Sequence, residues 1–147
     1  MSLKEKLMED FKDSMRNRDV VRKNTITMIR AAVKQREVDE RIQLKDEDII
    51  DIISKQLKEK KEAIEEFQRG KRQDLVDLTE KEMNILLEYL PAQLTEEELE
   101  KVVKQTIDEV EAKSMKDIGK VMKSVMPKIK GKADGKEVNR ICKKYLE

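Results

Sequence analysis

Apolar residues recur at helical spacing along almost the whole sequence, and few residues interrupt the pattern. Leu3, Leu7 and Phe11 share one side of a predicted first helix, and the same spacing returns in every later segment of similar length. Only four glycines and two prolines are present in 147 residues, and these are the residues that break helices most strongly. No segment shows the alternating pattern of a strand. The sequence therefore predicts an all-α, multihelical fold.

Capping signals divide this pattern into seven helices. Ser2 with Glu5 and Thr95 with Glu98 each match the capping box, in which two side chains satisfy free backbone N–H groups at a helix start. Gly70 is expected as the left-handed residue after the third helix, and Pro127 is expected to end the sixth. The predicted helix starts are Ser2, Asp19, Asp46, Gln73, Thr95, Ser114 and Asp134.

Pro91 is the predicted boundary between two helical subdomains. Four longer helices precede it and three shorter helices follow it, so we expect an N-terminal subdomain over residues 1–91 and a C-terminal three-helix bundle over residues 92–147. A chain of 147 residues can bury one ordinary core or two small ones. Both subdomains together would form a single functional unit.

The residue types present exclude several common catalytic sites. The sequence has no histidine, which removes the commonest general base and the commonest zinc ligand. A serine or cysteine triad cannot be built from this chain alone, and no glycine-rich nucleotide-binding motif is present. We therefore expect no catalytic residue, no metal site and no cofactor.

Cysteine content and hydropathy give an expectation for localisation. One cysteine excludes an internal disulfide and fits a reducing compartment. No apolar run approaches the roughly 18 residues of a membrane span, and no signal peptide precedes the first helix. The prediction is a soluble, cytoplasmic protein without membrane contact.

The charge changes sign near the C-terminus. Residues 113–146 contain 11 Lys/Arg and 3 Asp/Glu, a net charge of +8, whereas residues 1–112 contain 22 Lys/Arg and 28 Asp/Glu, a net charge of −6. The near-neutral total therefore conceals an acidic body joined to a basic tail. Such a tail predicts an anion-binding surface, with nucleic acid as the first candidate ligand.

The basic side chains of this tail are predicted to form one surface from two helices and the loop between them. Lys120 and Lys123 share a face of the sixth helix, and Lys128, Lys130 and Lys132 are predicted to lie in an extended loop before the last helix. Gly131 and Gly135 would let the backbone approach a phosphate. The candidate nucleic-acid-binding residues are Lys120, Lys123, Lys128, Lys130, Lys132, Lys136 and Arg140.

Another interpretation of these lysines stays open: they are also what the solvated faces of two amphipathic helices would carry. Tyr145 is the only aromatic residue of the tail and lies on its apolar stripe, so the stacking platform of single-strand readers is missing. If the tail binds RNA, contact with backbone phosphates is favoured over base stacking.

Two segments resemble the YqeY family. Residues 88–99, EYLPAQLTEEEL, are similar to its "YLP-x-QLS-x-EEL" signature. Residues 118–122, IGKVM, and residues 127–139, PKIKGKADGKEVN, are similar to its "GKVM…P-x-x-KGKADG-x-x-VN" signature. The likeness covers essentially the whole chain, although the N-terminal third matches mainly in pattern.

The resemblance implies a function connected with tRNA. YqeY proteins are similar to the C-terminal tail domain of the B subunit of glutamine-dependent aspartyl/glutamyl-tRNA amidotransferase, a helical domain in two subdomains that helps to hold the misacylated tRNA. The resemblance implies a stand-alone accessory module that binds tRNA or another structured RNA, without catalysis of its own. Two alternatives remain: an adaptor that docks on an amidotransferase or an aminoacyl-tRNA synthetase, and a carbon–nitrogen ligase with glutamine as amido donor, by family association.

Overall fold

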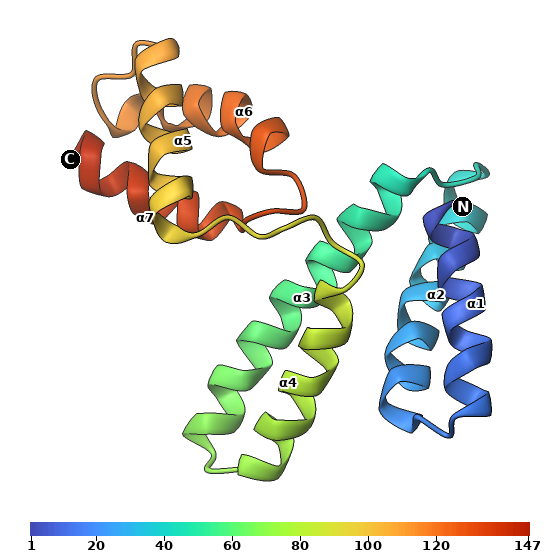
Figure 1. Cartoon of the computed structure of the whole chain (residues 1–147). Coiled ribbons are helices and arrows are strands. Elements are labelled where there is room, and N and C mark those ends of the chain that lie inside the picture. The colour runs from blue at the N-terminus through green and yellow to red at the C-terminus, as the bar shows by residue number, and fades with distance from the viewer. The chain divides into compact units, whose positions relative to one another are not determined.

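The computed structural model describes residues 1–147, and every regular element in it is a helix (Figure 1), which confirms the all-α prediction. The chain divides into two compact units, unit 1 over Met1–Leu90 and unit 2 over Pro91–Glu147. The helices of unit 1 are α1 (Leu3–Arg16), α2 (Val20–Glu40), α3 (Asp46–Arg69) and α4 (Gln73–Leu87). Unit 2 contains α5 (Glu96–Glu109), the short 3-10 turn η1 (Met115–Asp117), α6 (Ile118–Ile129) and α7 (Gly135–Leu146).

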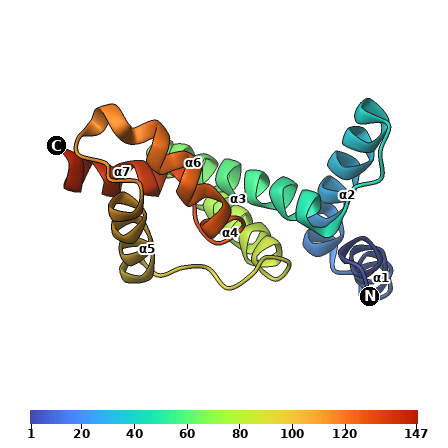
Figure 2. The same cartoon turned by 90° about the horizontal axis from the view of Figure 1, so that it is seen from above.

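Unit 1 consists of two helical hairpins, α1 with α2 and α3 with α4 (Figures 1 and 2). α2 packs against α1, α3 and α4, so it joins the two hairpins through one core. The buried apolar side chains of this core are Leu7, Ile26, Ile29, Val33, Leu44, Ile49, Ile53, Leu57, Ile85, Leu86 and Tyr89. They come from the stripes at helical spacing that the sequence shows.

A polar clamp fixes the end of α4 to the first hairpin. The Tyr89 hydroxyl donates a hydrogen bond of 2.6 Å to Oδ2 of Asp10 in α1. Arg22 in α2 forms a two-pronged ion pair with the carboxylate of Glu88. Burial and the hydrogen bond to Asp10 raise the pKa of Tyr89, so its hydroxyl stays a donor.

Unit 2 is a small bundle in which α5 packs on both α6 and α7. Two hydrogen bonds join the segment before α5 to the loop between α6 and α7. The Leu94 N–H donates to the Lys132 carbonyl at 3.0 Å, and Nε2 of Gln93 donates to the Gly131 carbonyl at 2.6 Å. The buried core residues are Leu99, Val103, Ile107, Val121, Val125, Ile129, Val138, Ile141, Cys142 and Leu146.

Pro127 does not end the sixth helix, contrary to the prediction. α6 continues through it to Ile129, and Val125 and Ile129 on either side are fully buried. A proline inside a helix removes one hydrogen bond and costs about 3 kcal/mol. The burial of Val125 and Ile129, which stabilises by about 1.5–3 kcal/mol for each side chain, offsets this cost. Core packing therefore outweighs the local signal.

Gly70 is also placed differently from the prediction. Gly70 is the C-cap residue of α3 and has a φ of −82°. The residue in the left-handed conformation is Lys71, with a φ of 56°. The Arg72 N–H then donates to the Phe67 carbonyl at 2.9 Å and closes the turn.

No helix in the structure is both long enough and apolar enough to span a membrane. No group of three or more Asp, Glu, Cys or His side chains is arranged to hold a metal ion.

Candidate nucleic-acid interface

The lysines of α6 lie on its solvent side because the opposite side enters the core of unit 2. Val121 and Val125 are fully buried, while Lys120 and Lys123 are exposed on the far side of the same helix. α7 has the same arrangement, with Val138 buried and Lys136 exposed.

The loop between these helices is shorter than the sequence suggested. Lys128 was expected in an extended loop, but it belongs to the last turn of α6 because that helix passes through Pro127. Lys130 and Lys132 are exposed in the remaining loop. Gly131 between them has a φ of 73°, the left-handed conformation that glycine adopts without steric cost. The turn therefore presents two of the three predicted loop lysines.

Gly135 serves helix packing. A Cβ added to it would lie 3.5 Å from Cε of Met122 and 3.7 Å from Sδ of Met126, so its bare side faces α6. This placement favours close approach of α7 to α6 over the predicted approach of a phosphate. Asp134 caps α7 by accepting from the Lys136 N–H at 3.0 Å, so a carboxylate already occupies that helix start.

Three cations of the tail pair with acidic side chains of α5. Nζ of Lys128 lies 2.7 Å from a carboxylate oxygen of Glu109 and donates to the Thr106 hydroxyl at 3.0 Å. Arg140 pairs with Glu96 of α5 and also with Glu137 in its own helix. Two of the seven predicted binding residues, Lys128 and Arg140, are therefore partly neutralised within unit 2.

Glu100 of α5 is the third acidic contact and the best-connected carboxylate of unit 2. It accepts a hydrogen bond from the Tyr145 hydroxyl and pairs with Lys144 at 3.0 Å. The Tyr145 hydroxyl and the Lys144 ammonium lower the pKa of Glu100. Tyr145, predicted to lie inside, is instead 38% exposed because its hydroxyl reaches this carboxylate.

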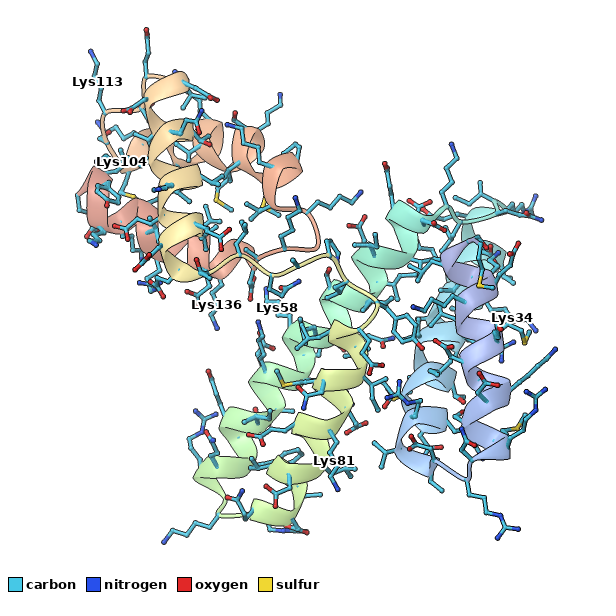
Figure 3. The ribbon with its side chains drawn as sticks, in the orientation of Figure 1. Lys34, Lys58, Lys81, Lys104, Lys113 and Lys136 are labelled. Atoms are coloured by element: carbon cyan, nitrogen blue, oxygen red, sulfur yellow. The ribbon has the colours of Figure 1, made fainter.

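Four of the other five predicted binding residues make up a set that we call the α6–α7 basic face. Its four members are exposed lysines that form no ion pair: Lys120, Lys123, Lys132 and Lys136. Figure 3 shows Lys136 extending outward from α7, whereas Lys113 extends from the other end of unit 2 and is not included. An anion can approach each of these ammonium groups without first breaking an ion pair.

Sequence reasoning missed that the acids that pair with Lys128, Arg140 and Lys144 lie in the same unit as these cations. Residues 91–112 contain 7 Asp/Glu and 2 Lys, a net charge of −5, whereas residues 1–90 contain 21 Asp/Glu and 20 Lys/Arg. The acidic body inferred from the sequence is therefore mainly α5. The run Glu96–Glu98 could have indicated this acidic helix. However, acidic residues in the first turn of a helix are also explained by their favourable interaction with the helix dipole.

Comparison with known proteins identifies one family over nearly the entire chain. The family model described as "Yqey-like protein" matches residues 4–146. The protein named "Altered inheritance of mitochondria protein 41, mitochondrial" of Pyrenophora tritici-repentis is 31% identical over 145 residues, which is 97% of this chain and 78% of the relative.

Proteins of the same name in two yeasts are also similar. The Kluyveromyces lactis protein is 34% identical over 58% of this chain and 47% of its own length. The protein of Saccharomyces cerevisiae strain YJM789 is 30% identical over 90% of this chain and 63% of its own length. The aligned part of this chain thus spans less than two thirds of the length of both yeast relatives.

These names correct the expected localisation. All three relatives are named as mitochondrial proteins, which contradicts the prediction of a cytoplasmic protein. The composition that suggested the cytoplasm, one cysteine and no membrane span, is equally compatible with a compartment enclosed by an organelle membrane.

Proposed function

The chain belongs to the YqeY-like family, and on this basis we propose that it is an RNA-binding module whose ligand is tRNA. The observation that carries the proposal is the α6–α7 basic face, four exposed lysines without ion pairs in a segment of net charge +8. The resemblance of YqeY proteins to the tRNA-holding tail domain of an amidotransferase favours tRNA over other RNAs. An enzyme partner, an amidotransferase or an aminoacyl-tRNA synthetase, would supply the chemistry.

Lysine ammonium groups suit the phosphate backbone better than they suit bases. They act as point charges with three donors, and neutralising phosphates releases condensed counterions, so binding weakens steeply as salt rises. No aromatic ring belongs to the α6–α7 basic face, and Tyr145 is engaged with Glu100. The expected contact is therefore made with the shape and the phosphates of a folded RNA.

The test compares two fourfold lysine variants in a tRNA-binding titration at several salt concentrations. Changing the α6–α7 basic face to alanine (Lys120, Lys123, Lys132 and Lys136→Ala) should reduce the slope of log K against log salt by roughly 3, since each phosphate contact contributes about 0.7–0.9. The matched control changes four exposed lysines of unit 1 that also lack ion pairs, Lys55, Lys61, Lys71 and Lys81→Ala, and should leave the slope close to that of the unaltered protein.

Single variants distinguish paired from unpaired cations. Lys123→Ala should weaken tRNA binding more than Arg140→Ala, because Arg140 already pairs with Glu96 and Glu137. The proposal is wrong if the unaltered chain does not bind tRNA at low salt, or if both fourfold variants bind with the same affinity and slope.

A further inference from the structure

The side of α2 that faces away from the core of unit 1 carries very little charge. Charged residues make up 44% of the chain, and they occupy 11 of the 12 exposed positions of the neighbouring helix α3. In α2 they occupy only three of the ten exposed positions. The other seven exposed residues of α2 are Val20, Asn24, Thr27, Met28, Ala31, Gln35 and Val38. This side of α2 therefore differs from the ordinary solvated helix faces of the same chain.

Five of these residues form a line that we call the α2 seam. Asn24, Met28, Ala31, Gln35 and Val38 follow one another at spacings of four, three, four and three residues, and all five are exposed. This is the spacing of the d and a positions of a heptad repeat, which form the contact line of a coiled coil. Met28 is 52% exposed and Val38 is 65% exposed. The seam thus has the pattern of a helix–helix contact, and no helix of this chain covers it.

The polar members of the seam, Asn24 and Gln35, favour a second copy of α2 as the helix that covers it. An amide side chain both donates and accepts hydrogen bonds, so it can pair with a copy of itself. In a parallel pair of α2 helices each seam residue lies opposite the same residue of the other copy. Gln35 donates to Oδ1 of Asp39 at 2.9 Å within its own helix, which leaves its second N–H and its carbonyl for the Gln35 of the partner copy.

The opposite helix direction fits the seam less well. In an antiparallel pair centred on Ala31, Asn24 would lie opposite Val38 and Gln35 opposite Met28. Both amides would then be buried against apolar side chains without hydrogen-bond partners, which costs about 1–3 kcal/mol for each group. The seam therefore favours the parallel direction.

The charges beside the seam favour the same arrangement. Lys34 occupies a g position, and Asp39 occupies the e position five residues later. In a parallel coiled coil a g residue lies beside the e residue five positions on in the partner helix, so Lys34 of each copy would approach Asp39 of the other. Lys34 forms no ion pair within its own chain, so it is available for this contact.

α2 is already held as a helix, which removes one cost of association. It packs against α1, α3 and α4, so the two helices of a pair would not have to fold as they meet. The seam from Asn24 to Val38 is only about 21 Å long, and small interfaces bind weakly. The expected association is therefore a weak one that depends on protein concentration.

We propose that two copies of the chain associate through parallel pairing of their α2 seams, about a two-fold axis that runs along the two helices. Each copy contributes the same residues, as a two-fold symmetric interface requires. The α2 seam lies in unit 1 and uses no residue of the α6–α7 basic face. This proposal and the RNA proposal can therefore fail separately.

Sedimentation velocity of the full chain, freed of nucleic acid, tests the association between about 10 μM and about 1 mM protein. The unaltered chain should shift from monomer to dimer in this range. Met28→Lys with Val38→Lys would bury ammonium groups next to one another and should weaken dimerisation at least about tenfold. The matched control, Met15→Lys with Leu78→Lys, changes two exposed apolar residues outside the seam and should weaken it less than about twofold. Both variants should keep the circular dichroism spectrum and the tRNA affinity of the unaltered chain.

Cross-linking tests the parallel direction. Val38→Cys places two thiols opposite each other only in the parallel pair, so in a glutathione redox buffer it should form a disulfide-linked dimer at least about tenfold faster than the control Leu78→Cys. The native thiol of Cys142 is buried and does not compete. Lys34→Glu should weaken dimerisation because it faces Asp39 of the partner copy, and adding Asp39→Lys should restore it.

Several outcomes would overturn the proposal. They are a chain that stays monomeric at 1 mM, a dimer that Met28→Lys with Val38→Lys leaves intact, equal cross-linking of Val38→Cys and Leu78→Cys, or no recovery in the Lys34→Glu, Asp39→Lys variant. A monomeric chain that binds phospholipid vesicles, and loses this binding in Met28→Lys with Val38→Lys, would assign the seam to a membrane surface instead.

Discussion

The two units have nearly balanced charge, but they reach that balance in different ways. Unit 1 contains 20 Lys/Arg and 21 Asp/Glu, and unit 2 contains 13 Lys/Arg and 11 Asp/Glu. In unit 1 the signs are interspersed, and pairs such as Arg22–Glu88 and Lys60–Glu82 join different helices. In unit 2 the acids gather on α5 and the bases gather on α6 and α7.

The difference shows why net charge is a poor guide to function. In unit 1 each charge has charges of the opposite sign close by, so their electrostatic potentials largely cancel. Exposed charges more than about 10 Å apart are largely screened by salt and add little to the potential at any one place. The separated charges in unit 2 leave four exposed lysines of α6, α7 and the loop between them without ion pairs, even though the unit as a whole carries only a small net charge. The binding of a polyanion to unit 2 therefore depends on which cations already form ion pairs with α5.

The largest expected effect tests whether the two cores are separate. Leu86→Ala in unit 1 and Ile129→Ala in unit 2 each remove a fully buried side chain, and each should lower the free energy of unfolding by about 2–5 kcal/mol. Because each core is made of residues from one unit, native-state hydrogen exchange should show faster exchange in the altered unit alone. Loss of protection in both units from either substitution would show that they unfold as one body.

A smaller effect is expected from neutralising α5. Replacing two acids of this helix, Glu96→Gln with Glu100→Gln, removes the acid partner of Lys144 and one of the two acid partners of Arg140, which keeps its pair with Glu137. Exposed pairs contribute about 0.2–1 kcal/mol each, so tRNA affinity at low salt should rise by roughly twofold to tenfold. The control, Glu62→Gln with Glu65→Gln in α3, removes the same charge from unit 1. An equal rise in both variants would mean that only total charge matters.

The smallest effect concerns pH. Lys4 and the Leu44 N–H lower the pKa of Glu37 in unit 1, and Tyr145 and Lys144 lower that of Glu100 in unit 2. A carboxylate whose pKa is lowered by folding stabilises the protein above its unfolded pKa, and this stabilisation is lost as pH falls through the folded value. Glu100→Gln should therefore flatten the acid dependence of unfolding in unit 2 only, and Glu37→Gln in unit 1 only. Urea unfolding between about pH 6 and about pH 3, followed by NMR, measures both. If either variant changed the pH dependence of unfolding equally in both units, the assignment of Glu37 to the stability of unit 1 and of Glu100 to that of unit 2 would be wrong.

Local signals predicted most helix starts because each is a property of a few neighbouring residues. Ser2, Thr95 and Asp134 do cap α1, α5 and α7 by accepting from backbone N–H groups. The errors arose where tertiary packing competes with a local preference, as at Pro127, where the burial of Ile129 keeps the helix intact.

The candidate site was predicted only in part, for the same reason. The lysines of α6 and α7 could be assigned to helix faces from spacing alone. The pairing of Arg140 with Glu96 and of Lys128 with Glu109 could not be predicted, because these partners are 44 and 19 residues apart in sequence.

Cys142 gives unit 2 a chemical reporter that unit 1 lacks. The thiol is the only one in the chain, it is fully buried in the core of unit 2, and burial raises its pKa. A disulfide reagent can modify it only when that core opens, so the labelling rate measures how often α7 detaches while unit 1 stays silent. A ligand that rigidifies unit 2 should slow the labelling, and one that docks on unit 1 alone should leave its rate unchanged.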